Sequence, residues 1–82
     1  MVILEFRRLE AFQDAASTLE GIKVPFHAEV SDVDFRPHRV WLFPEDFRSP
    51  DQQKALARVR LLEKKDRVRS AAMALPNLAD PL

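Results

Sequence analysis

The chain has 82 residues, with thirteen basic and thirteen acidic side chains and a formal net charge of zero, and this length fits one small domain. Because it has no cysteine, it has neither a disulfide framework nor a thiolate metal site, and we expect a reducing, cytoplasmic environment. A single glycine is too few for phosphate-binding loops or dinucleotide fingerprints, so no cofactor is expected, and no apolar run is long enough for a membrane span.

The first two elements follow from hydrophobic spacing. Residues 2–8 predict a strand, because Val2, Leu4 and Phe6 alternate on one face. Residues 9–20 predict a helix, because their apolar side chains recur at spacings of three and four. Gly21 then follows, and we expect it to stop this helix in the left-handed conformation.

Two further strands are predicted in the middle of the chain. Residues 24–35 predict one bent strand or two short ones, with a bulge near residues 31–32 where the alternation breaks. The segment 36–38 is a turn, and residues 39–44 predict the returning strand of a hairpin.

The second helix has the clearest start. Ser49 is a good N-cap, Pro50 suits the first helical position, and Gln52 completes a capping-box pattern with Ser49. We expect this helix to run to Ala74 or Leu75. The domain therefore covers residues 1–75, and residues 76–82 form an irregular tail.

The order of these elements predicts an α+β fold of the type β-α-β-β-α. A right-handed crossover makes the first two strands parallel, and the third strand fits between them in the sheet order 1-3-2. Both helices then lie on one face. This is a ferredoxin-like fold without its last strand, and the first strand is left with a free edge.

The long second helix is expected to overhang the sheet, because about 25 residues span about 38 Å whereas the domain is roughly 30 Å across. One apolar stripe, which should face the sheet, contains Ala55, Leu56, Val59 and Leu62. A second stripe lies on nearly the opposite side and contains Ala57, Leu61, Val68, Ala72 and Leu75. It should meet another chain, and its expected interface residues are Leu61, Val68, Ala72 and Leu75. The alternative is that the helix bends or stops near residues 64–66.

One face of the sheet is left open if both helices cover the other. The open face carries either Trp41 and Phe43 or Val40 and Leu42, and together with Ile3 it forms an apolar patch. Such a patch is typical of an interaction surface, so Trp41 is a candidate contact. The alternative is that a loop or the tail covers it.

The charge is distributed unevenly along the chain. Residues 1–50 carry six bases and nine acids, whereas residues 51–70 carry seven bases and three acids. Possible nucleic-acid contacts on the helix are Lys54, Arg58, Lys65 and Arg69. The zero net charge argues against this use, and the alternative is a solvated helix surface with internal ion pairs.

Evidence for catalysis is weak. His27 and Glu29 fall on the same face of a strand, but two ligands are too few for a metal site and no third is indicated. No nucleophile, base and orienting residue form a set. We therefore expect no catalytic residue and no bound metal.

The segments Leu19-Glu20-Gly21-Ile22 and Val40-Trp41-Leu42-Phe43-Pro44-Glu45-Asp46 resemble those of small bacterial signal-transducing domains. These domains share the strand–helix–hairpin–helix order and are distant relatives of the PII fold. The resemblance covers about residues 2–63 and implies a fold more than an activity. No ligand residue is carried over.

These patterns together predict a small non-catalytic protein with a regulatory or accessory role. It is expected to act by protein–protein contact, as a homodimer or with another protein. A nucleic-acid-binding module that uses the basic helix is the alternative.

Overall fold

The computed structural model describes residues 1–33 and 36–74, with side chains up to residue 71. In chain order its elements are β1 (Val2–Phe6), α1 (Leu9–Gly21), β2 (Phe26–Glu29), β3 (His38–Leu42), a 3-10 turn η1 (Pro44–Asp46) and α2 (Pro50–Ala74). The predicted α+β order is confirmed. The predicted tail, residues 76–82, lies outside the described residues.

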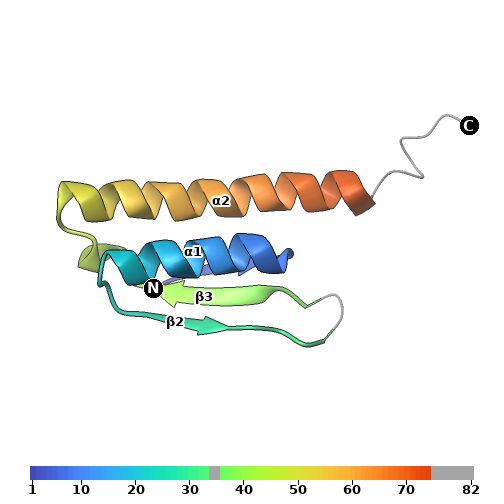
Figure 1. Ribbon diagram of the computed structural model, residues 1–82, viewed down its shortest axis with the longest axis horizontal. Coiled ribbons are helices and arrows are strands. Elements are labelled where there is room, and N and C mark those ends of the chain that lie inside the picture. Colours follow the sequence, from blue (N-terminus) through green and yellow to red (C-terminus); the bar gives the residue numbers. More distant parts are fainter. Residues whose placement is uncertain (34–35, 75–82) are drawn as a thin grey trace, which may run out of the picture.

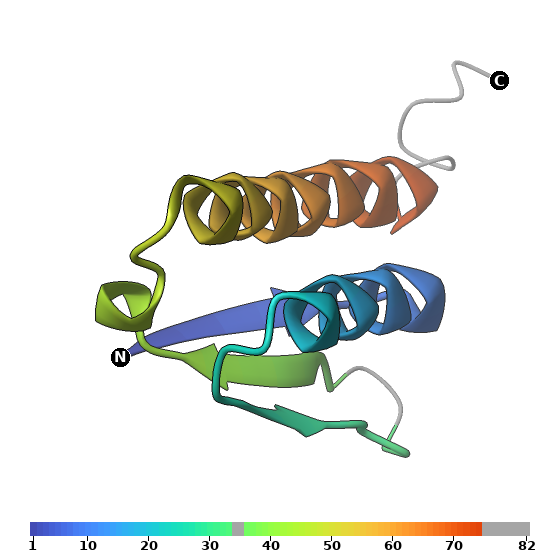
Figure 2. The same cartoon turned by 60° about the vertical axis from the view of Figure 1, so that its left-hand side comes forward.

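The sheet has the predicted order β1-β3-β2, and β3 is antiparallel to both neighbours. Both helices lie on the same side of it and run in opposite directions (Figures 1 and 2). The core lies between the sheet and the helices, and its buried side chains are Leu4, Phe6, Phe12, Ala15, Leu19, Val24, Val40, Leu42, Phe47 and Val59.

All three predicted strands are longer than the observed ones. β1 ends at Phe6 because the next two backbone N–H groups, of Arg7 and Arg8, donate to the carboxylate of Asp66 on α2. β2 ends at Glu29, and the backbone N–H of Ser31 donates to Nδ1 of His38 at 2.9 Å.

β3 ends at Leu42 and leads through Phe43 into η1, whose first residue, Pro44, has no N–H to donate to a ladder.

The expectation for Gly21 is wrong. Gly21 is the last residue of α1 and does not have a positive φ; the left-handed residue is Lys23, with φ 57°. The chain therefore turns two residues later than expected. The N–H groups of Ile22 and Lys23 close this turn by donating to the carbonyl oxygens of Leu19 and Glu20.

The start of α2 is confirmed in detail. The N–H of Gln52 donates to Oγ of Ser49 at 3.1 Å, and the N–H of Ser49 donates to Oε1 of Gln52 at 3.0 Å. This is the reciprocal capping box that the sequence predicts. α2 then runs without interruption from Pro50 to Ala74, so the alternative of a break near residues 64–66 is wrong.

The long helix extends past α1, as its length requires (Figure 1). Its first stripe faces the core, with Ala55 and Val59 buried and Leu56 and Leu62 packed against the buried cluster. Leu61 and Val68, on the second stripe, are 50% and 62% exposed. The description of side chains ends before Ala72, and Leu75 lies outside the described residues.

Candidate functional site

The first candidate surface is a groove between α1 and α2, which we call the helix groove. Its apolar floor includes Ala11, Leu61 and Val68. Basic side chains of α2 and acidic side chains of α1 stand around this floor, so the groove has an apolar centre and charges of both signs at its margins. The charged lining residues are Arg8, Glu10, Asp14, Lys64, Lys65 and Arg69.

The helix groove unites two predicted sets that the sequence analysis kept apart. Leu61 and Val68 come from the predicted apolar interface, whereas Lys65 and Arg69 come from the predicted basic sector. Of the other two basic residues, Lys54 is exposed near the start of α2, and Arg58 forms an ion pair with Asp14, with 3.7 Å between Nη2 and Oδ1. The basic sector is therefore partly neutralised by α1.

The second candidate surface is the open face of the sheet. Trp41 and Phe43 lie on this face, because Val40 and Leu42 are fully buried against the helices. In the register of the sheet, Ile3, Trp41 and His27 form one row across the three strands. A shallow apolar hollow beside this row is lined by Met1, Pro25, Phe26, His27, Trp41 and Phe43.

Nothing in the described residues forms a layer over this open face (Figures 1 and 2). Ile3 is 46% and Phe43 44% exposed, whereas Trp41 is half-buried. The predicted apolar patch is therefore present. However, Trp41 and the helix groove lie on opposite sides of the sheet, so the predicted contacts form two separate surfaces rather than one.

His27 is held by its neighbours on the open face. Its Nε2 lies 3.0 Å from Oε1 of Glu29, and its ring centroid lies 5.1 Å from that of Trp41. Both side chains of the His27–Glu29 pair are about two-thirds exposed. Among the residues with described positions, no group of three or more His, Cys, Asp or Glu could hold a metal ion.

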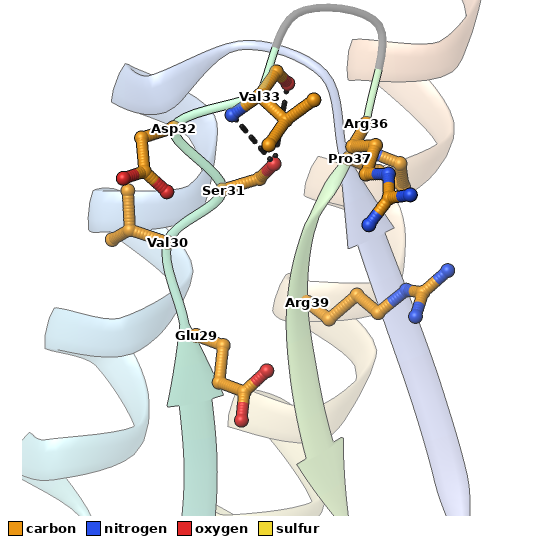
Figure 3. Close-up of a pocket in the computed structure, with 8 residues that line it drawn as sticks. All are labelled: Glu29, Val30, Ser31, Asp32, Val33, Arg36, Pro37 and Arg39. Atoms are coloured by element: carbon orange, nitrogen blue, oxygen red, sulfur yellow. Dashed lines mark hydrogen bonds between the residues drawn. The ribbon is translucent and has the colours of Figure 1, made fainter.

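A further hollow lies at the loop end of the β2–β3 hairpin (Figure 3). Glu29 and Arg39 lie at its base, and the Oγ of Ser31 is 3.3 Å from both the N–H and the carbonyl oxygen of Val33. Val30 projects from the outer side of the strand, away from Arg39 (Figure 3). The mixed charges here do not define a ligand class.

The most important polar group in the structure was not singled out from the sequence. Asp66, in the middle of α2, is only 2% exposed. Its carboxylate accepts the N–H of Arg7 at 2.7 Å and the N–H of Arg8 at 3.1 Å. One turn earlier, Oε2 of Glu63 accepts the N–H of Glu5 at 2.7 Å. Two carboxylates of α2 therefore accept hydrogen bonds from backbone N–H groups in the last part of β1 and just beyond it.

The sequence does carry a signal for Asp66. Ala55, Val59, Leu62 and Asp66 follow one another at spacings of four, three and four, so Asp66 occupies the next position of the stripe that faces the core. A carboxylate at a core position must have hydrogen-bond partners. The basic residues around Asp66 obscure this signal in the sequence.

No protein-family model matches this chain, and the curated proteins and solved structures yield no match either. The resemblance to bacterial signal-transducing domains therefore stays a prediction. In the part of the chain that the structure describes, no helix combines the length and apolarity needed to cross a membrane.

Proposed function

We propose that this chain is a small non-catalytic protein with a regulatory or accessory role, and that it acts by protein–protein contact as a homodimer. In this proposal the helix groove receives an amphipathic helix of a protein partner. A cytoplasmic location belongs to the same proposal, because the absence of cysteine favours a reducing compartment. The resemblance to signal-transducing domains agrees with a regulatory role.

The observation that carries the proposal is the exposure of Leu61 and Val68 on the second stripe of α2. The core-facing stripe already anchors α2 to the domain, so these two side chains are not needed to hold the helix in place. Apolar side chains one heptad apart on an exposed helix are typical of a helix–helix contact.

The margins of the groove suggest what the partner helix looks like. Lys65 and Arg69 stand on the α2 side, whereas Glu10 on the α1 side forms an ion pair with Arg8 at 2.9 Å. A partner helix would match this arrangement with an apolar stripe flanked by acids on the side that faces α2. Such charges add specificity more than affinity.

The test is to identify proteins that co-purify with the full chain from its native host and to reconstitute binding with the purified partner. Val68→Asp places a charge on the groove floor and should abolish the reconstituted binding. Gln53→Asp, at an exposed position in the first turn of α2 outside the groove lining, makes the same charge change as the matched control and should bind normally. Equal binding by both variants would refute the assignment of the groove.

A second candidate function is nucleic-acid binding, which the cluster of Lys64, Lys65 and Arg69 along the groove favours. The aromatic residues Trp41 and Phe43 lie on the other face of the sheet, so the basic helix and these rings do not form one continuous surface. Retention on immobilised single- or double-stranded nucleic acid at low salt, lost in Lys65→Glu/Arg69→Glu, would support this alternative. Absence of retention would exclude it.

A further inference from the structure

The two outer edges of the sheet differ in how their backbone groups are used. At β1, the outward N–H of Glu5 donates to Glu63, and the N–H of Arg7 just beyond the strand donates to Asp66. At β2, no element of the described chain lies along the outer edge (Figure 2). An uncovered strand edge is a template for pairing with another strand, so β2 is the edge where a strand can be added.

The alternation of the antiparallel ladder shows which β2 groups face outward. The Glu5 N–H donates to Glu63 and so points away from β3, which makes Glu5 and Arg39 a non-hydrogen-bonded pair. The backbone N–H and C=O of Arg39 therefore point to the other neighbour of β3, toward Glu29 of β2. Along β2, the residues that bond β3 are therefore His27 and Glu29. Phe26 and Ala28 direct their N–H and C=O groups to the free edge.

Proline does not protect this edge. Pro25 has the same parity as His27, so the N–H that it lacks belongs to the inner side of the strand. The outward positions on either side of Ala28 are Phe26 and Val30, both of which retain their N–H groups. Three successive outward positions can therefore take part in a new ladder.

We propose that a second copy of this chain pairs with this edge, β2 against β2, antiparallel about a two-fold axis at Ala28. Ala28 then pairs with Ala28 of the partner subunit through hydrogen bonds, and the small side chain lets the two strands approach. The helices of both copies lie on the same side, so the two sheets join into one of six strands. This inference rests on the homodimer of the proposed function.

The side chains select this register over its neighbours. With the axis at Ala28, His27 faces the partner subunit's Glu29 in a non-hydrogen-bonded pair, where side chains approach most closely. Because of the two-fold axis this contact occurs twice, and in each the imidazole of one subunit lies beside the carboxylate of the other. An axis at His27 sets imidazole against imidazole, and an axis at Glu29 sets carboxylate against carboxylate, which is destabilising.

The other face of the strand agrees with the same register. It places Phe26 opposite the partner subunit's Val30. Val30 is 58% exposed and projects from the outer side of the strand (Figure 3). Pairing across the axis would cover Val30 with the side chain of Phe26 of the partner subunit. The two-fold axis repeats this apolar contact at each end of the paired strands.

The test is light scattering of the full chain from low to high micromolar concentration. We expect wild-type protein to dimerise and Glu29→Lys to raise the dimer dissociation constant about tenfold or more, because both carboxylates that accept an imidazole N–H across the axis are lost. His27→Glu/Glu29→Lys sets opposite charges across the axis and should restore the dimer. Glu45→Lys, at an exposed position of η1, makes the same charge change and should dimerise like wild type.

Each outcome distinguishes the edge from the homodimer itself. If wild type is a dimer and Glu29→Lys leaves it intact, pairing at the β2 edge is refuted but the homodimer is not. If Val68→Asp then dissociates that dimer, the contact belongs to the helix groove instead. A monomer at all concentrations would overturn both. Far-UV circular dichroism and thermal melting confirm that each variant folds, which the exposure of His27 and Glu29 favours.

Discussion

Replacement of Asp66 is predicted to be the most damaging polar substitution in this domain. Asp66→Ala removes the carboxylate that accepts both the Arg7 and Arg8 N–H groups, at 2.7 and 3.1 Å. These donors are partly buried, and each stranded donor costs about 1–3 kcal/mol, so we expect a loss of about 3–5 kcal/mol. A domain of this length has a total stability of about 4–12 kcal/mol.

The measurement is urea unfolding, followed by the fluorescence of Trp41 and by far-UV circular dichroism. With a denaturant slope of about 1 kcal/mol per molar, the predicted loss moves the midpoint by about 3 M or more, or leaves the variant unfolded in water. Asp66→Asn keeps one accepting oxygen and should lose about half as much stability. Glu20→Ala removes an exposed carboxylate from α1 as the control. If Asp66→Ala and Glu20→Ala unfold at the same midpoint, the reasoning is refuted.

Three further predictions use the same urea measurement. Glu63→Ala should cost only about 0.5–1 kcal/mol, because the Glu5 N–H that it releases is exposed and can bond water; a loss as large as that of Asp66→Ala would contradict this. Gly21→Ala should raise the free energy of unfolding by about 0.5–1 kcal/mol, because Gly21 is helical and an added Cβ meets nothing within 4 Å; destabilisation would mean that Gly21 needs the left-handed conformation after all. Leu19→Ala, at a fully buried position, should cost about 2–5 kcal/mol, whereas Leu61→Ala should cost less than about 1 kcal/mol because Leu61 is half exposed. Equal losses at the two leucines would show that the floor of the helix groove belongs to the core.

The topology was predictable because its signals are local. The alternation of Val2, Leu4 and Phe6 is sufficient for β1, and Ser49 with Gln52 identifies the start of α2 to the residue. The preference for right-handed crossovers then leaves few sheet orders, and 1-3-2 is observed. Each of these inferences needs only neighbouring residues or a general rule of connection.

The surfaces were less predictable because they depend on contacts between distant segments. Alternation along β3 shows that Trp41 and Leu42 face opposite ways but cannot tell which of them meets the helices. Packing decides this by burying Leu42, so Trp41 faces away from the helix groove. The partners of Asp66 lie 58 and 59 residues away, and no local pattern names them.

The same carboxylates have a consequence for the order in which the chain folds. Glu63 and Asp66 follow the β1 groups that they bind by 58 or 59 positions, so the strand that is synthesised first is completed last. Before the far half of α2 docks, the outward N–H groups at β1 have no carboxylate of α2 to accept them. A partly folded chain without α2 in place therefore has both edges of its sheet unprotected, and neighbouring chains can pair along β1.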